Sequence, residues 1–206
     1  GARSAMAAAA FALVVAAVAG AAAAEMRVGV GERVPAAVLA LELEVCNSNA
    51  GVSTVSLGAL SAPMTVVAHY YVGCTPGRSD SPMYTQTAAL IEALYPGEVS
   101  FLTTLKNGVN NATCEAWATQ PGSATSTRWP YVVNDEHRAL VYPLFDAQVH
   151  PSYVVLDHCH RVHAQLGSIA SATNALREAV ESARTLLSEP CPDAEGDAAP
   201  EPEPEP

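Results

Sequence analysis

The chain has 206 residues, of which half are hydrophobic, and its formal net charge is −11. Seven acidic residues and no basic ones lie between Glu189 and Pro206. Removing these seven charges from −11 leaves −4 on the remainder, which excludes nucleic-acid binding through a strongly basic surface.

The N-terminal segment is an apolar run of residues 5–24, preceded by Arg3 and ending in three alanines. A basic flank, an apolar centre and small residues at the exit predict a signal peptide over residues 1–24. The run is also about long enough to span a bilayer, so an uncleaved membrane anchor is the other interpretation. We therefore expect a secreted or secretory-pathway protein, with a membrane partner only if this segment is retained.

The C-terminal segment, residues 189–206, alternates glutamate and proline and has almost no apolar side chains to bury. This composition predicts a disordered, solvated acidic tail. The sequence between the two ends divides into an N-terminal extension, residues 25–56, and one domain, residues 57–188. In the extension we expect a strand from Val38 to Val45 that pairs with residues 52–57 as a hairpin.

The domain is organised around a cysteine that follows its most apolar strand. Residues Met64 to Val72 form a continuous apolar run, as expected of a central strand covered on both faces. Cys74 follows, and a helix is predicted from Asp80, with this aspartate or the preceding serine as its cap and Pro82 in its first turn. A cysteine at the start of a helix is suited to thiol chemistry, because the helix N-terminus stabilises a thiolate.

The rest of the domain alternates strand and helix patterns. A return strand over residues 161–167 should place Val162, Ala164 and Leu166 on one face. The remaining predicted elements are strands at 99–105, 129–133 and 152–157, short helices at 114–119 and 139–145, and a final helix at 172–187.

This order of elements, with Cys74 after the first strand and Pro151 heading a later one in VHPSYVVLD (residues 149–157), resembles the thioredoxin-like superfamily. The resemblance covers about residues 57–187 and is nearest to secreted or membrane-tethered thiol–disulfide oxidoreductases and peroxiredoxin-related proteins. It implies an α/β three-layer sandwich with a central mixed sheet, preceded here by the hairpin extension. It also implies that Pro151 is cis and packs beside the active cysteine.

The sequence departs from the family at its active-site motif. Cys74 matches the first cysteine of C-x-x-C, but Gly77 replaces the second. Residues 64–72 contain no acidic side chain to accept a proton, and the peroxidase motif P-x-x-x-T-x-x-C has Val67 and Tyr71 at its proline and threonine positions. Disulfide exchange or peroxide reduction by Cys74 alone, and an inactive binding or structural module with the same fold, therefore both remain open.

Two further residues are predicted to assist Cys74. His150 precedes the family proline, and a cationic imidazole there would favour the thiolate. Cys114 could act as a distant resolving cysteine. The expected partners are protein thiols or disulfides, or a small peroxide. No glycine-rich nucleotide or phosphate motif is present, so no cofactor is predicted.

The five cysteines predict one or two disulfides and a free thiol in an oxidising compartment. Cys159 is expected to pair with Cys46 or Cys191. It lies among three histidines at positions 158, 160 and 163, whose spacing does not match a closed structural zinc site, so no metal site is predicted.

Overall fold

The structure, a computed structural model, describes residues 27–46, 51–71, 75–106, 111–118, 131–135, 139–145, 151–168 and 174–192. Its strands form one seven-stranded mixed sheet in the order β2-β1-β5-β4-β3-β6-β7. The strands are β1 (Leu43–Val45), β2 (Thr54–Val55), β3 (Met64–Tyr71), β4 (Val99–Lys106), β5 (Tyr131–Asn134), β6 (Ser152–Leu156) and β7 (Val162–Leu166). β3, β4 and β5 are parallel, and the other neighbours pair antiparallel.

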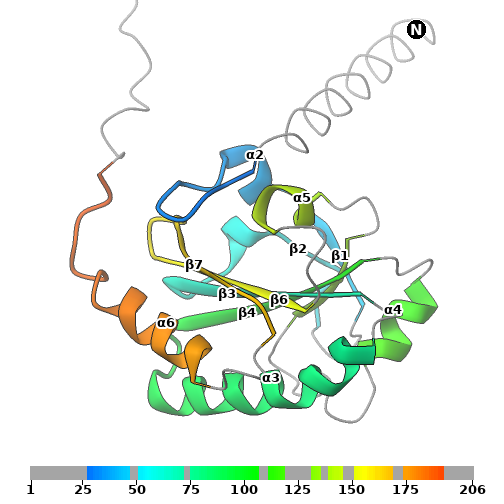
Figure 1. Cartoon of the computed structure of the whole chain (residues 1–206). Helices are drawn as coiled ribbons and strands as arrows, with labels where there is room; N and C mark the ends of the chain where they lie inside the picture. The colour runs from blue at the N-terminus through cyan, green and yellow to red at the C-terminus, as the bar shows by residue number, and fades with distance from the viewer. Residues whose placement is uncertain are drawn as a thin grey trace, which may run out of the picture.

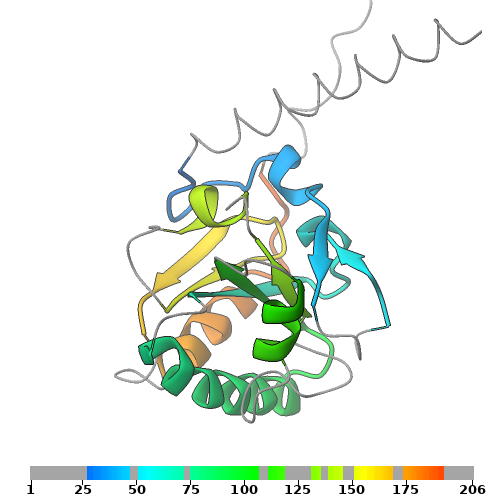
Figure 2. The same ribbon diagram turned by 90° about the vertical axis from the view of Figure 1, so that its right-hand side faces the viewer.

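Helices cover both faces of this sheet and make a three-layer α/β sandwich (Figure 1). They are α2 (Ala36–Leu39), the 3₁₀ turn η2 (Leu57–Ala59), α3 (Thr75–Leu94), α4 (Asn111–Ala118), α5 (Val141–Leu144) and α6 (Ala175–Arg184). Residues of α3, α4 and α6 share one buried cluster, and residues of α2 and α5 share the other. Figure 2 shows α6 (orange) beside α3, on the same side of the sheet.

The central strand β3 is buried on both faces, as its continuous apolar sequence predicts. Val66, Ala68 and Tyr70 point into the cluster under α3 and α6, while Val67 joins the cluster under α2 and α5. The predicted N-terminal hairpin is also confirmed, with Leu43 of β1 opposite Val55 of β2. Burial on both faces explains why a strand in this position has no polar alternation.

One edge of the sheet gathers the ends of several elements, and we call it the carboxyl edge. Strands β3, β4 and β5 end there, at Tyr71, Lys106 and Asn134. Strand β6 runs the opposite way and therefore begins there, because Ser152 pairs with His69 near the end of β3. In open α/β sheets, ligands bind outside the carboxyl ends of the parallel strands.

Two predicted element boundaries are wrong. The expected strand from Val38 begins only at Leu43, because residues 36–39 form α2 with backbone bonds back to Pro35 and Ala36. The expected helix from Asp80 begins at Thr75, so Pro82 lies inside α3 and not in its first turn. Asp80 lies in the second turn of α3, and its carboxylate accepts hydrogen bonds from Tyr153 and Ser168 outside the helix.

The predicted face of the return strand is also wrong. Val155 pairs with Ala164 but the next residue, Leu156, pairs with Val162, so β7 has an extra residue at this point. Such a bulge moves the following side chains to the other face. Val162 consequently packs under α2 and α5, while Ala164 packs under α3 and α6.

Two disulfides connect elements that are distant in the sequence. Cys46, just after β1, bonds to Cys114 of α4, and Cys159, in the turn after β6, bonds to Cys191 beyond α6. Of the two partners expected for Cys159, Cys46 and Cys191, the structure confirms Cys191. Within the residues that the structure describes, no helix is long and apolar enough to cross a membrane. The predicted signal segment and most of the acidic tail lie outside these residues.

Candidate active site

Two of the four predicted site residues, Cys74 and His150, lie outside the described residues. The chain on each side of Cys74 is described: β3 ends at Tyr71 and α3 begins at Thr75. Pro151 is buried directly before β6, at the carboxyl edge. The cis geometry expected for the bond between His150 and Pro151 stays a prediction.

The fourth predicted residue, Cys114, is fully buried and bonded to Cys46, so it offers no thiol while that bond is intact. The described part of the chain pairs four of the five cysteines with one another. Cys74 is the remaining cysteine. The structure therefore provides no free thiol at Cys114 to act as a resolving cysteine.

A buried carboxylate lies six residues after Cys74. Asp80 of α3 is fully buried, and its Oδ2 accepts a 2.6 Å hydrogen bond from the hydroxyl of Tyr153 on β6. Its Oδ1 accepts a 3.0 Å hydrogen bond from Ser168, just beyond β7. One carboxylate thereby connects the first turns of α3 with the start of β6 and the end of β7.

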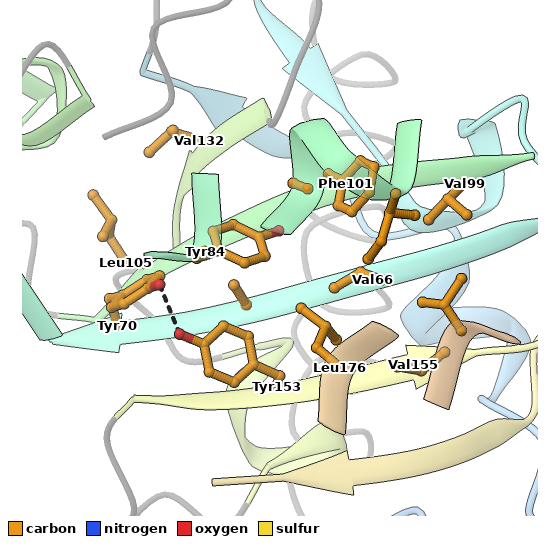
Figure 3. Close-up of a cluster of buried hydrophobic side chains, with 14 of the residues drawn as sticks. Val66, Tyr70, Tyr84, Val99, Phe101, Leu105, Val132, Tyr153, Val155 and Leu176 are labelled. Atoms are coloured by element: carbon orange, nitrogen blue, oxygen red, sulfur yellow. Dashed lines mark hydrogen bonds between the residues drawn. The ribbon is translucent and has the colours of Figure 1, made fainter. Parts of the chain in front are cut away.

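The hydrogen bonds continue from Tyr153 to a second tyrosine. The hydroxyls of Tyr153 and Tyr70 are 2.9 Å apart, and Figure 3 shows them pointing toward each other from neighbouring strands. A tyrosine hydroxyl has one hydrogen, and that of Tyr153 is donated to Asp80, so Tyr70 donates to Tyr153. Each of the three buried polar side chains in this series, Tyr70, Tyr153 and Asp80, therefore has a hydrogen-bond partner, and each donor hydrogen points toward the carboxylate.

The surroundings keep these tyrosines protonated. Burial is the main cause that raises the pKa of Tyr153, and the nearby Tyr70 and Asp80 raise it further. Burial also raises the pKa of Tyr70 well above its ordinary value, although the hydrogen bond with Tyr153 acts in the opposite direction. Both hydroxyls are therefore available as hydrogen-bond donors throughout the physiological pH range.

Aromatic rings surround this hydrogen-bonded chain and join it to the helices. The ring of Tyr70 is 5.2 Å from that of Trp117 on α4 and 6.1 Å, edge-on, from that of Tyr153. Tyr84 of α3 lies 5.4 Å from Tyr153. Separations of this size are typical of favourable aromatic pairs. The same tyrosines consequently provide both the polar contacts and much of the apolar packing.

A pocket of about 180 Å³ opens beside the start of β6. It is lined by Leu144, Phe145, Ser152, Tyr153, Gln165, Leu166 and Gly167. Its α5 side is positioned by the buried Asp135, whose carboxylate accepts hydrogen bonds from the backbone N–H groups of Ala139 and Val141. Tyr153 belongs both to this pocket and to the hydrogen-bonded chain, so the pocket borders the buried polar cluster.

Asp80, Tyr153 and Ser168 are not among the site residues that the sequence predicts. The sequence pattern indicates Asp80 as a helix cap, and residues 64–72 contain no acidic side chain. Tyr153 falls within a predicted strand. A signal was nevertheless present, since a carboxylate at a position that the helix buries needs a donor, and a tyrosine on an apolar strand carries one.

Searches find no family model and no curated protein that match this chain. Solved structures do match. One is a protein described as thiol:disulfide interchange protein DsbE from Chlorobium tepidum, with a TM-score of 0.58 and 16% identity, covering 76% of this chain and 98% of that one. A secreted Mycobacterium tuberculosis disulfide oxidoreductase matches at TM-score 0.52 and 10% identity, over 72% and 99% of the two chains.

A third matching structure is that of a protein that reduces peroxides. The bacterioferritin comigratory protein of Xanthomonas campestris, which has alkyl peroxide reduction activity, aligns at TM-score 0.55 and 15% identity, over 77% of this chain and 98% of that one. At these identities the matches show the fold, which is thioredoxin-like as the sequence predicts. The two disulfides are consistent with an oxidising, extracytoplasmic location.

The Tyr153→Phe substitution tests the contact between β6 and α3. It removes the donor to a buried carboxylate oxygen, so the free energy of unfolding should fall by about 1–3 kcal/mol in urea denaturation. Tyr70→Phe is the matched control, because it removes a neutral outer donor and should cost less, about 0.5–1.5 kcal/mol. Equal losses for the two variants would contradict the direct role of Tyr153.

Alkaline pH should destabilise the fold through the buried tyrosines. Burial raises the pKa of Tyr70, Tyr84 and Tyr153 above the unfolded value of about 10. Their stabilising effect is thus complete below about pH 10 and is lost as the pH rises, because only the unfolded chain then releases these protons. Tyr153→Phe should reduce the slope of unfolding free energy against pH, above pH 10, by about 1.4 kcal/mol per pH unit.

This measurement is best made by urea denaturation in a Cys74→Ser background, which removes the thiol that would scramble the disulfides at high pH. Tyr131→Phe, a half-buried tyrosine on β5, is the matched control. The same change of slope in both variants would show that the effect does not come from the buried cluster.

Proposed function

We propose that this protein is a thiol-dependent oxidoreductase of the secretory pathway in which Cys74 is the single nucleophile in disulfide exchange. One observation carries the proposal: the other four cysteines are bonded to one another, which leaves Cys74 as the thiol of the chain. The thioredoxin-like fold supports it, because Cys74 falls in the sequence between Tyr71, where β3 ends at the carboxyl edge, and Thr75, where α3 begins.

The first step is attack of the Cys74 thiolate on one sulfur of a disulfide in a partner protein. The partner's S–S bond breaks as the new bond to Cys74 forms. The other half of the partner leaves as a thiolate and takes a proton from solvent. Cys74 is thereby oxidised to a mixed disulfide and the released sulfur is reduced.

Release of the partner requires an outside thiol. Gly77 stands where the family has its second cysteine, and Cys114 is engaged with Cys46. An external thiol attacks the partner-side sulfur of the mixed disulfide, regenerates the Cys74 thiolate and leaves bonded to the partner. The proposed protein therefore retains its partner covalently until a second thiol compound arrives.

The start of β6 provides the surface for the bound partner. Pro151 is buried beside the end of β3, and the pocket lined by Phe145, Tyr153 and Leu166 opens next to it. Apolar walls and a few polar groups are typical of a site that takes a side chain of a ligand. An extended partner segment that carries a disulfide next to an apolar residue fits this description.

Peroxide reduction is less well supported. It would need the Cys74 thiolate to attack a peroxide oxygen, forming a sulfenic acid and releasing an alcohol after protonation. In the peroxidase motif P-x-x-x-T-x-x-C, this chain has Val67 at the proline position and Tyr71 at the threonine position. Val67 is fully buried in the core. Peroxide reduction and an inactive binding module are therefore treated as outcomes of the test.

The test compares the wild type with Cys74→Ser. With oxidised glutathione, the wild type should gain one glutathione by mass spectrometry, and it should accelerate reduction of a protein disulfide by reduced glutathione. Both properties should be lost in Cys74→Ser and kept in the matched control Cys159→Ser/Cys191→Ser. Thiol-dependent consumption of an alkyl hydroperoxide instead would indicate peroxide reduction, and inactivity in every assay would indicate a binding module.

The role proposed for His150 is tested by the rate at which iodoacetamide alkylates Cys74 as a function of pH. If a cationic imidazole favours the thiolate, His150→Ala should slow alkylation below pH 7 and move the rise of the rate to higher pH. His163→Ala, a histidine on β7 bonded to Ser182, is the control. Superimposable profiles for the wild type and His150→Ala would rule the role out.

A further inference from the structure

A group of one histidine and two cysteines lies at the turn after β6. His158 and Cys191 are half-buried and Cys159 is buried, and one ligand atom from each lies within 4.8 Å of the others. The Nε2 of His158 is 3.3 Å from the Sγ of Cys159 and 2.8 Å from the carbonyl oxygen of Glu189. Three metal-ligating side chains from two distant segments therefore converge at one point.

The spacing of these atoms suits a metal ion. A tetrahedral zinc ion with Zn–N of about 2.0 Å and Zn–S of about 2.3 Å places its nitrogen and sulfur ligands about 3.5 Å apart. The Nε2 of His158 is already close to this distance from Cys159. The Cα atoms of Cys159 and Cys191 are 5.5 Å apart, so both side chains reach a common point without movement of the backbone.

The turn that contains His158 and Cys159 is also stabilised by hydrogen bonds that do not involve the disulfide. The Oδ1 of the buried Asp157 accepts a 2.9 Å bond from the N–H of Cys159 and another from that of Arg161. His158 Nδ1 is buried and has no hydrogen-bond partner among the described residues. When Nε2 binds a metal, it gives up its hydrogen bond to the carbonyl oxygen of Glu189, and Nδ1 carries the ring proton.

We propose that, once the Cys159–Cys191 disulfide is reduced, these two thiolates and His158 bind a zinc-class metal ion. Thiolate and imidazole are the ligands that this class prefers, and three protein ligands leave a fourth position open. In the oxidised protein the two sulfurs are bonded to each other and carry no thiolate charge. The redox state of the disulfide therefore controls whether the site exists.

Reduction of the Cys159–Cys191 disulfide needs a reductant from outside the protein, and an external dithiol can serve as one. The dithiol gives two electrons and two protons to the Cys159–Cys191 bond, becomes a cyclic disulfide, and leaves two cysteine thiols. A divalent ion then displaces the two thiol protons as it binds. A low-molecular-weight disulfide is the oxidant for the reverse step: it takes two electrons from the two thiolates, leaves as two thiolates, and the re-formed Cys159–Cys191 bond releases the ion.

This site is distinct from the region of Cys74. β6 begins at the carboxyl edge and ends at Leu156, next to the turn, so Pro151 and His158 lie at opposite ends of the strand. Five strand residues separate the two ends by roughly 16 Å. The proposal is therefore independent of the disulfide-exchange function.

The experiment titrates Co²⁺, a spectroscopic substitute for Zn²⁺, into the full chain in a Cys74→Ser background. One sample is oxidised and the other is reduced by a phosphine under native conditions. The reduced sample should show a thiolate-to-cobalt absorption band that the oxidised sample lacks, and Zn²⁺ should abolish the band by competition. Alkylation and mass spectrometry should show reduction at Cys159 and Cys191.

Variants locate the ligands. His158→Ala should weaken Co²⁺ binding at least about tenfold. His160→Asn is the matched control in the same turn, because residue 160 has φ 57° and asparagine suits this left-handed conformation. Its affinity should equal that of the parent.

Several results would overturn the proposal. They are the absence of the band in the reduced parent, equal affinity in His158→Ala, or a band that persists in Cys159→Ser/Cys191→Ser and so comes from Cys46 and Cys114. A reduced chain that loses its circular dichroism signal and does not regain it with Zn²⁺ would overturn it as well.

Discussion

The hydrogen bond between Tyr153 and Asp80 is the contact on which the arrangement of the carboxyl edge depends. It connects the early turns of α3 to β6, two residues after Pro151, across 73 positions of the chain. A carboxylate fully buried among tyrosine rings is stable only if its oxygens are satisfied. Asp80 therefore holds α3 in one position relative to the sheet, and α3 is the helix that directly follows Cys74 in the sequence.

The parts of the fold that could be predicted are those in which burial determines the sequence directly. The apolar run of β3 and the strand after Pro151 are buried on both faces, so their composition identified them. The start of α3 could not be found in this way. Asp80 and Pro82 have the chemistry of a helix start, and only the tertiary contact with Tyr153 explains an aspartate there. The bulge in β7 was missed because alternation does not reveal an inserted residue.

The residues of the candidate site also differ in whether the sequence could predict them. Cys74 and Pro151 are local signals within short motifs, so sequence alone could nominate them. The hydrogen bonds of Asp80 could not be predicted, because patterns along the chain report how deeply a residue is buried but not which distant residue it meets. The disulfides illustrate the same limit: several pairings of Cys46, Cys114, Cys159 and Cys191 were compatible with the sequence, and only the folded chain distinguishes them.

The antiparallel direction of β6 has a consequence for the two proposed sulfur sites. Cys159 follows one end of β6, and Pro151, next to the end of β3, precedes the other. A spacer of roughly 16 Å of saturated backbone is far longer than the contact that thiol exchange requires. Under the two proposals made above, each site would therefore react with its own external partner, without direct exchange between the two sites.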